Sequence, residues 1–194
     1  MNLNATLAVG LLTVAGIFAS ATSAQAAEEY KIDPAHSFIE FKIQHLGYSW
    51  LHGRFNEFSG GFTVDRENPA NAGAEITIAT GSIDSNHAER DKHLRSGDFL
   101  SVDEHPEARF VATSVTDNGD GTGTIEGELT LRGQTNPVEI AVEEIGHGED
   151  PWGGYRAGFE GTASIALADY GIDYDLGPAA AEVQLTLGVE GVRQ

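Results

Sequence analysis

The sequence predicts a mainly β protein, an eight-stranded antiparallel barrel or sandwich with one helix inserted between the third and fourth strands. Eight segments alternate apolar and polar residues with a period of two, which is the pattern of strands with one buried and one solvated face. One-sided strands of this kind favour antiparallel over parallel sheets. Only one stretch, residues 82–100, has helical spacing and helix-capping residues instead.

The N-terminal residues predict a secretory signal peptide over residues 1–26. An apolar run at 7–19 is followed by small residues and by Ala24-Gln25-Ala26, which fits a cleavage site. The run is too short to span a membrane, and it departs from the usual pattern because no Lys or Arg precedes it. Cleavage leaves residues 27–194, that is 194 − 26 = 168 residues, as one domain that we expect in the periplasm.

Composition excludes several classes of function. The chain has no cysteine, so disulfides, thiol chemistry, a lipoprotein anchor and cysteine-ligated metals are all excluded. With 11 basic and 30 acidic residues, the net charge is −19. Phosphate backbones and anionic headgroups require a basic surface, so we expect no nucleic-acid partner and no stable membrane insertion. The composition is also compatible with a homodimer.

Three strands are expected before the helix, at 37–45, 53–65 and 74–83. In the first, Ile39, Phe41 and Ile43 point to one side and charged or amide side chains to the other. In the second, we expect a bulge or bend at Gly60-Gly61, because glycines within a strand are typical of such irregularities.

Five strands are expected after the helix, at 108–116, 124–132, 138–143, 155–167 and 182–190. The first two are joined by Asn-Gly-Asp-Gly at 118–121, a strong hairpin sequence. The last three alternate clearly between apolar and polar residues, so each is expected to bury one face.

The predicted helix carries a dense group of ionisable side chains. Asn86 is its expected N-cap, with Glu89 completing a capping box, and Gly97 is placed to end it. One helical face then carries Leu94, the only large apolar residue between positions 86 and 97, together with His87, Arg90 and Asp91. If Leu94 docks the helix, this polar trio faces inward. The opposite, solvated face is expected to carry Lys92, Ser96, and His93 paired with Glu89.

An eight-stranded barrel is either filled by side chains or holds one small ligand. The inward faces carry small residues at Gly127, Ala157, Gly161 and Ala163, between larger ones. These small residues leave room along the barrel axis, or they fit a tapered and filled core. The sequence alone leaves both interpretations open.

Metal binding and catalysis find little support in the sequence. His87 and Asp91 have the i, i+4 spacing of helical metal ligands, but no third ligand is evident nearby and Arg90 would repel a cation. The sequence has no nucleophile elbow, phosphate-binding loop or zinc-protease motif. His45 continues the inward face of the first strand, where it is either a rim residue or a donor to a ligand's polar head.

The segment NHAERDKHLRSGDFL at 86–100 resembles the characteristic segment of the YceI-like family of secreted lipid-binding barrels. Four further stretches match that family: DPAHSFIEFKIQHLG at 33–47, GRFNEFSGGFTVD at 53–65, GELTLRGQTNPVEI at 127–140 and VEGVRQ at 189–194. The resemblance extends from about residue 30 to the C-terminus. It implies a lipocalin-like eight-stranded barrel that binds a long isoprenoid chain in its lumen.

Together these observations predict a periplasmic binding or carrier protein for an isoprenoid amphiphile, either a polyprenyl phosphate or an isoprenoid quinone, with no other cofactor and no catalysis. One alternative is a lipid-modifying enzyme with His87 and Asp91 as acid and base. Another is a filled barrel with a stress or interaction role. The expected ligand-binding residues are His45, Phe55, Phe58, Phe62, Ile76, Ile78, His87, Arg90, Asp91, Leu94, Phe99, Phe110, Leu129 and Phe159.

Overall fold

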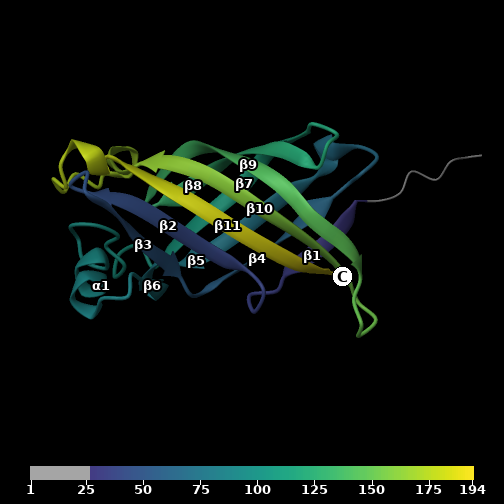
Figure 1. Cartoon of the computed structure of the whole chain (residues 1–194), viewed down its shortest axis with the longest axis horizontal. Helices are drawn as coiled ribbons and strands as arrows, with labels where there is room; N and C mark the ends of the chain where they lie inside the picture. The colour runs from purple at the N-terminus through teal and green to yellow at the C-terminus, as the bar shows by residue number, and fades with distance from the viewer. Residues whose placement is uncertain (1–26) are drawn as a thin grey trace, which may run out of the picture.

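The computed structural model describes residues 27–194 and confirms a closed antiparallel β-barrel with one helix (Figure 1). The predicted signal peptide, residues 1–26, lies outside the described residues. The strands and the helix are β1 Glu28–Ile32, β2 Phe38–His45, β3 Ser49–Phe55, β4 Phe58–Val64, β5 Gly73–Ala79, β6 Ile83–Asp84, α1 Ala88–Leu94, β7 Glu107–Asp117, β8 Thr122–Leu131, β9 Gln134–Glu149, β10 Tyr155–Ala166 and β11 Glu182–Arg193.

The short strands combine into eight walls around one lumen. β1 and β2 run one after the other along β11, to which both are paired. β4 and β3 pair with β1 and β2 in turn, and β5 and β6 pair with β4 and β3. The remaining five strands are long and follow in order, and the β1–β11 pair closes the ring. The predicted number of eight strands is therefore confirmed.

The strand predicted at 53–65 needs correction. It begins earlier, at Ser49, and it is interrupted at Asn56 and Glu57, where β3 ends and β4 begins. The β4–β5 register runs through Gly60 and Gly61 without a shift, so the bulge predicted there as one of two alternatives is absent. Gly60 is instead needed for its backbone: its φ is +140°, and a Cβ there would collide with the carbonyl oxygen of Glu75.

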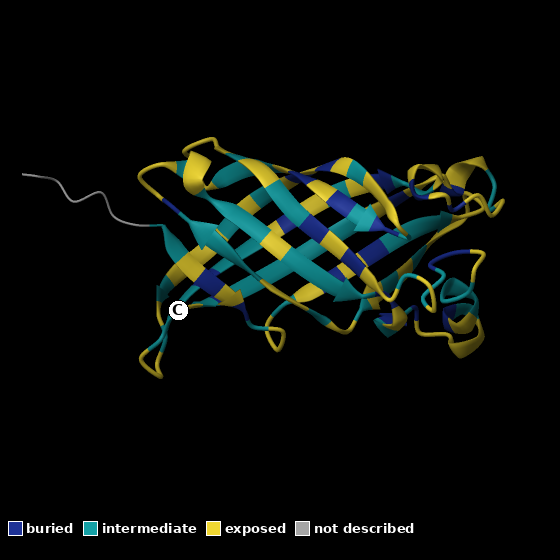
Figure 2. Ribbon diagram, turned by 180° about the vertical axis from the view of Figure 1, so that it is seen from behind, coloured by how far each residue is buried: buried dark blue, intermediate teal, exposed yellow. Residues whose placement is uncertain are grey.

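The alternating pattern of the strands appears directly in their burial (Figure 2). Phe110, Leu129, Ile140 and Ile165 are all buried on inward faces, while their sequence neighbours are more exposed. The first strand, β1, was not predicted, although Tyr30 and Ile32 follow the same alternation and are 2% and 4% exposed. The inward residues of the strands therefore surround a common interior.

The barrel has two different ends (Figure 1). One end, called here the helix end, carries α1, the loop at 95–106, the β2–β3 turn and the segment at 167–181, with its 3₁₀ turns Leu167–Tyr170 and Pro178–Ala180. The other, called the terminal end, lies where β1 meets the C-terminal residues of β11. No helix within residues 27–194 has both the length and the apolar character needed to cross a membrane.

The helix differs from the prediction at both of its ends. His87, not Asn86, is the N-cap, and its Nδ1 accepts a hydrogen bond from the backbone N–H of Arg90 at 3.3 Å. Asn86 lies before the cap in a left-handed conformation, with φ of +61°. The helix ends at Leu94 rather than near Gly97. With seven residues it is too short to be stable alone, so it must be held by its contacts.

Candidate functional site

The barrel interior holds a cavity of about 800 Å³, so side chains do not fill the lumen. Its wall is formed by the inward, mostly apolar residues of the strands, and it reaches residues at both ends of the barrel. A cavity of this size, lined by apolar groups with a few polar ones, is typical of a small-molecule binding site.

Eleven of the fourteen predicted ligand-binding residues line this cavity: His45, Phe55, Phe62, Ile76, Ile78, Arg90, Leu94, Phe99, Phe110, Leu129 and Phe159. The other three, Phe58, His87 and Asp91, are not among the lining residues. Phe58 pairs with Ile78 across β4 and β5 but lies next to the interruption between β3 and β4. The structure therefore brings most of the predicted set together around one space.

A carboxylate ties the helix to Ser85, the residue that follows β6. Asp91 is 7% exposed, and its Oδ1 accepts hydrogen bonds from the backbone N–H of Ser85, at 2.8 Å, and from the Ser85 hydroxyl. Arg90 donates from Nε to the same hydroxyl at 2.7 Å and from Nη2 to the Ser85 carbonyl at 2.5 Å. Burial opposes ionisation of Asp91, but the hydrogen bonds from Ser85 and the charges of Arg95 and Arg90 outweigh it and lower its pKa.

The expected inward trio is only partly correct. Asp91 is buried and Arg90 is half-buried, but His87 is exposed, because it caps the helix from outside the first turn. In the described part of the chain, the side chains of His87 and Asp91 share no hydrogen bond. The pair therefore lacks the contact that an acid and base acting together would need.

The structure also corrects the position of His93, which was expected on the solvated face beside Glu89. The ring of His93 packs edge-on against Phe99 and Tyr174, with centroids 4.9 and 5.1 Å apart, and its Nε2 lies 2.8 Å from Asp98 Oδ2. His93 and Tyr174 both line the cavity. Tyr174 comes from the segment between β10 and β11, so no local pattern could have identified this pair.

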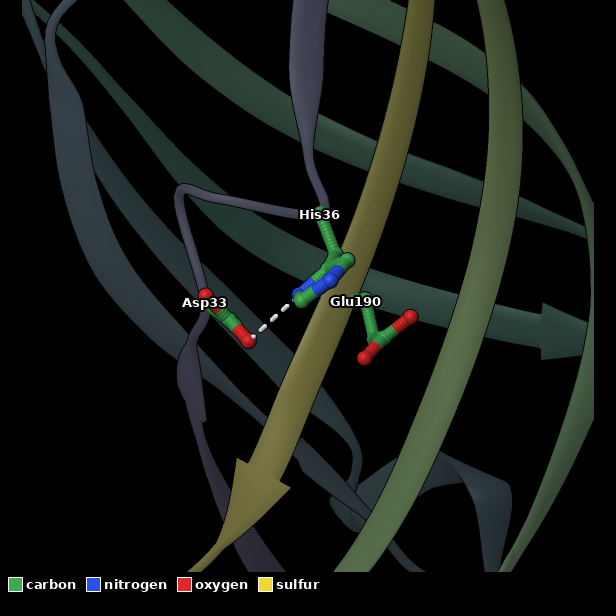
Figure 3. Close-up of side chains that lie close together, drawn as sticks. All are labelled: Asp33, His36 and Glu190. Carbon is green, nitrogen blue, oxygen red and sulfur yellow. Dashed lines mark hydrogen bonds and ion pairs between the residues drawn. The ribbon is translucent and has the colours of Figure 1, made fainter. Parts of the chain in front are cut away.

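A second cluster of ionisable residues lies on the β1–β2 connection and on β11. Figure 3 shows Asp33, His36 and Glu190, whose potential ligand atoms lie within 4.8 Å of one another. The guanidinium of Arg156 already pairs there with Asp33, Glu190 and Asp150. Its hydrogen bond, with those from His36 and the Ala35 N–H, lowers the pKa of Asp33 to about 2. Because the carboxylates are paired with an arginine, we assign the cluster to structural stabilisation rather than to metal binding.

Comparison with known proteins gives a consistent picture. The family model described as YceI-like domain matches residues 30–191. A UPF0312 protein of Pseudomonas aeruginosa is 60% identical over 176 residues, which cover 89% of this chain and 92% of the relative. A UPF0312 protein of Serratia proteamaculans is 54% identical over 184 residues, covering 94% and 95%.

Solved structures share the fold at low sequence identity. BcnA of Burkholderia cenocepacia superposes with a TM-score of 0.73 at 21% identity, covering 82% of this chain and 98% of that one. A polyisoprenoid binding domain from Saccharophagus degradans superposes with a TM-score of 0.63 at 15% identity, covering 85% and 98%. At such identities, the likeness supports the barrel architecture.

Proposed function

The chain belongs to the YceI-like family, and from this membership and the apolar lumen we propose that it is a binding or carrier protein for a long-chain isoprenoid amphiphile. The observation that carries the proposal is the cavity of about 800 Å³ lined mostly by inward apolar side chains. Each CH₂ group moved from water into such a lumen contributes about 0.8 kcal/mol. The name of the structural relative from Saccharophagus degradans, a polyisoprenoid binding domain, supports the same class of ligand.

We place the polar head of the ligand at the helix end. Arg90 lines the cavity there and uses Nε and Nη2 to bind Ser85. Within residues 27–194, its Nη1 has no hydrogen-bond partner, so it is available to an oxygen of the ligand. A phosphate oxygen or a quinone carbonyl oxygen suits this donor, and His45, His93 and Tyr174 add polar atoms around the same opening.

The protein would act in the periplasm, as the predicted signal peptide suggests, where a long isoprenoid tail needs protection from water. We favour binding without reaction over lipid modification. The pair assigned to acid–base chemistry in that alternative is separated into an exposed helix cap, His87, and a buried anchor, Asp91.

The first test is native mass spectrometry of the mature protein purified from its own periplasm, followed by organic extraction. We expect one bound lipid per protein, whose mass identifies the tail and the head. A protein that is empty and that also fails to take up added polyprenyl phosphate and isoprenoid quinone would refute the proposal. A chemically altered lipid among the extracted products would favour the enzyme.

Arg90→Ala tests the position of the head. We expect the affinity for a polyprenyl phosphate to fall by roughly tenfold or more, since a hydrogen bond between charged groups contributes about 1.5–3 kcal/mol. Affinity for the uncharged polyprenol should change little. Lys92→Ala is the matched control, because Lys92 lies on the same helix, is exposed and does not line the cavity. Equal losses in the two variants would contradict the role of Arg90.

A further inference from the structure

An ion pair crosses the lumen at the terminal end. Arg66 Nη2 lies 2.8 Å from Glu144 Oε1, and Arg66 Nη1 lies 3.0 Å from Glu144 Oε2, so the contact is bidentate. Both residues line the cavity. Arg66 follows the end of β4 by two residues, and Glu144 lies within β9.

The order of strands shows that this pair joins opposite walls. Between β4 and β9, the strands β5, β7 and β8 lie on one side of the ring, and β1, β11 and β10 lie on the other. The two strands are therefore diametrically opposed. An ion pair between neighbouring strands lies along the wall of a barrel, whereas this one must extend across the opening.

Both partners are held in place by their surroundings. Next to Arg66, the buried carboxylate of Asp65 accepts hydrogen bonds from the backbone N–H groups of Glu67 and Asn68, at 3.1 and 2.8 Å, and from Asn71 Nδ2 at 2.8 Å. These bonds fix the turn that follows β4 and so fix the starting point of the Arg66 side chain.

Glu144 is positioned by the strand itself. It continues the inward series of Val138, Ile140 and Val142 on β9, at the position where that series reaches the terminal end. Its backbone N–H donates to the Gly121 carbonyl at 2.8 Å, and its Oε1 lies 2.7 Å from His147 Nδ1. The Glu144 side chain is 20% exposed and that of Arg66 is 38% exposed, so the pair is partly withdrawn from water.

We propose that the Arg66–Glu144 pair forms the floor of the lumen and sets the longest isoprenoid tail that the barrel accepts. This inference rests on the proposed function and deepens it, because it assigns a residue pair to tail-length specificity. A tail that enters from the helix end meets apolar walls until it reaches this pair. The tail can pass only if the bidentate pair is broken, which costs both of its hydrogen bonds and places two unpaired charges beside hydrocarbon.

The length of the barrel limits how much of a tail can be buried above the floor. From Phe159, which pairs with Glu144, to Ala166 near the helix end, the 8 residues of β10 span about 20 Å along the barrel axis, at a rise of about 3.4 Å per residue and a strand tilt of about 40°. A tail longer than this path must leave isoprene units in water at the helix end, or it must pass the floor. Removing the floor should therefore strengthen binding of long tails and leave short tails unchanged.

The test compares Arg66→Ala and Glu144→Ala with the unaltered mature protein. Each protein is offered a ladder of all-trans polyprenols that differ by one isoprene unit, from geranylgeraniol upward, and bound species are measured by native mass spectrometry. The unaltered protein should show a sharp upper limit in tail length. In both variants we expect the first excluded polyprenol to bind at least about tenfold more tightly, since its last unit is then buried.

A matched control and a rescue separate the floor from general effects. Arg109→Ala removes the same charge from an exposed ion pair, Arg109 with Glu75, whose residues do not line the cavity. It should keep the limit of the unaltered protein. The double variant Arg66→Glu with Glu144→Arg restores the pair in reverse and should restore the limit.

The possible outcomes distinguish the inference from the proposed function. If the unaltered protein binds polyprenols with the same limit as both alanine variants, the floor is elsewhere and the inference is overturned. If the unaltered protein binds no polyprenol of any length and also no polyprenyl phosphate or isoprenoid quinone, the proposed function itself fails. Circular dichroism of each variant confirms the barrel, and Arg66→Ala alone decides the test if Glu144→Ala does not fold.

Discussion

Asp91 is predicted to be the main attachment of the helix to the barrel, and Asp91→Ala tests this directly. The substitution removes the acceptor of two hydrogen bonds from Ser85, whose backbone N–H and hydroxyl are then buried without that partner. A hydrogen bond to a charged group contributes about 1.5–3 kcal/mol to stability, and two give a range of about 3–6 kcal/mol. The short helix can detach locally, so we expect the lower end, about 3 kcal/mol.

The assay is equilibrium unfolding in urea, followed by circular dichroism. Glu89→Ala is the matched control, because it removes a carboxylate from the same helix at an exposed position. It should cost less than about 1 kcal/mol, the value of an exposed charge in the first turn of a helix. If the two substitutions lower the free energy of unfolding equally, Asp91 does not anchor the helix.

The pH dependence of the Asp91 effect has a defined sign. The pKa of Asp91 is lowered in the folded protein from its ordinary value of 3.8, so its contribution to stability is complete above that value. It is lost as pH falls through the folded-state pKa, because the unfolded chain takes up the proton first. The difference in stability between the unaltered protein and Asp91→Ala should therefore narrow below about pH 4.

Three further predictions concern the lumen, the ionisable cluster around Asp33, and Gly60 in β4. Ala163→Phe places a ring in the cavity and should weaken polyprenol binding by at least about tenfold without loss of the fold. Thr162→Phe is the control, because Thr162 lies on the outward face, and it should bind polyprenol normally. Equal binding by both variants would count against the lumen as the site. The Asp33 pKa of about 2 means that its contribution to stability is present above about pH 3.8 and is lost between there and pH 2, so Asp33→Asn should flatten this limb of a stability–pH curve measured by urea unfolding. Gly60→Ala should lower the free energy of unfolding by about 3 kcal/mol, because a Cβ at φ of +140° collides with Glu75. Gly146→Ala meets open space and is its control, and a similar small effect for both would show that Gly60 is not constrained.

The fold could be predicted because each wall of the barrel carries its own pattern. Ile39 and Phe41 alternate with Glu40 and Lys42, and this is enough to assign a strand and its buried face without knowledge of its neighbours. Interruptions were harder to locate. The two glycines at positions 60 and 61 led to the prediction of a bulge or bend there. The interruption lies instead at Asn56, where β3, paired with β2, ends before β4, which is paired with β1.

The start of the helix could not be predicted correctly from local sequence rules. Asn86 and His87 are adjacent and both can cap a helix, and the capping box favours Asn86. The folded chain uses His87, since Ser85 must lie where Asp91 and Arg90 can both reach it. That requirement comes from the attachment of the helix to the barrel. Spacing along the helix identified Arg90 and Asp91 as neighbours of the barrel but could not place His87.

Contacts across the lumen could not be predicted from the sequence. Arg66 and Glu144 are 78 residues apart, and each occurs in a chain with many other charges. Their pairing follows from two facts that only the closed ring supplies, namely that β4 and β9 face each other and that both reach the same end. Alternation does indicate that Glu144 is unusual, because it places a carboxylate on the inward face of β9.

Whether the lumen is filled or hollow depends on where the aromatic rings lie, and the positions of the rings cannot be predicted from the sequence. The small inward residues left both interpretations open, because a glycine on an inward face removes volume from the core. In the structure, the ring of Phe110 lies over Gly127 and that of Phe41 lies over Gly53, so each ring occupies the space that a Cβ would take. A ring held against a glycine stays at the wall and does not extend toward the axis. The glycines therefore keep the lumen open by accommodating rings at the wall, and the same residues with the rings turned inward would fill it.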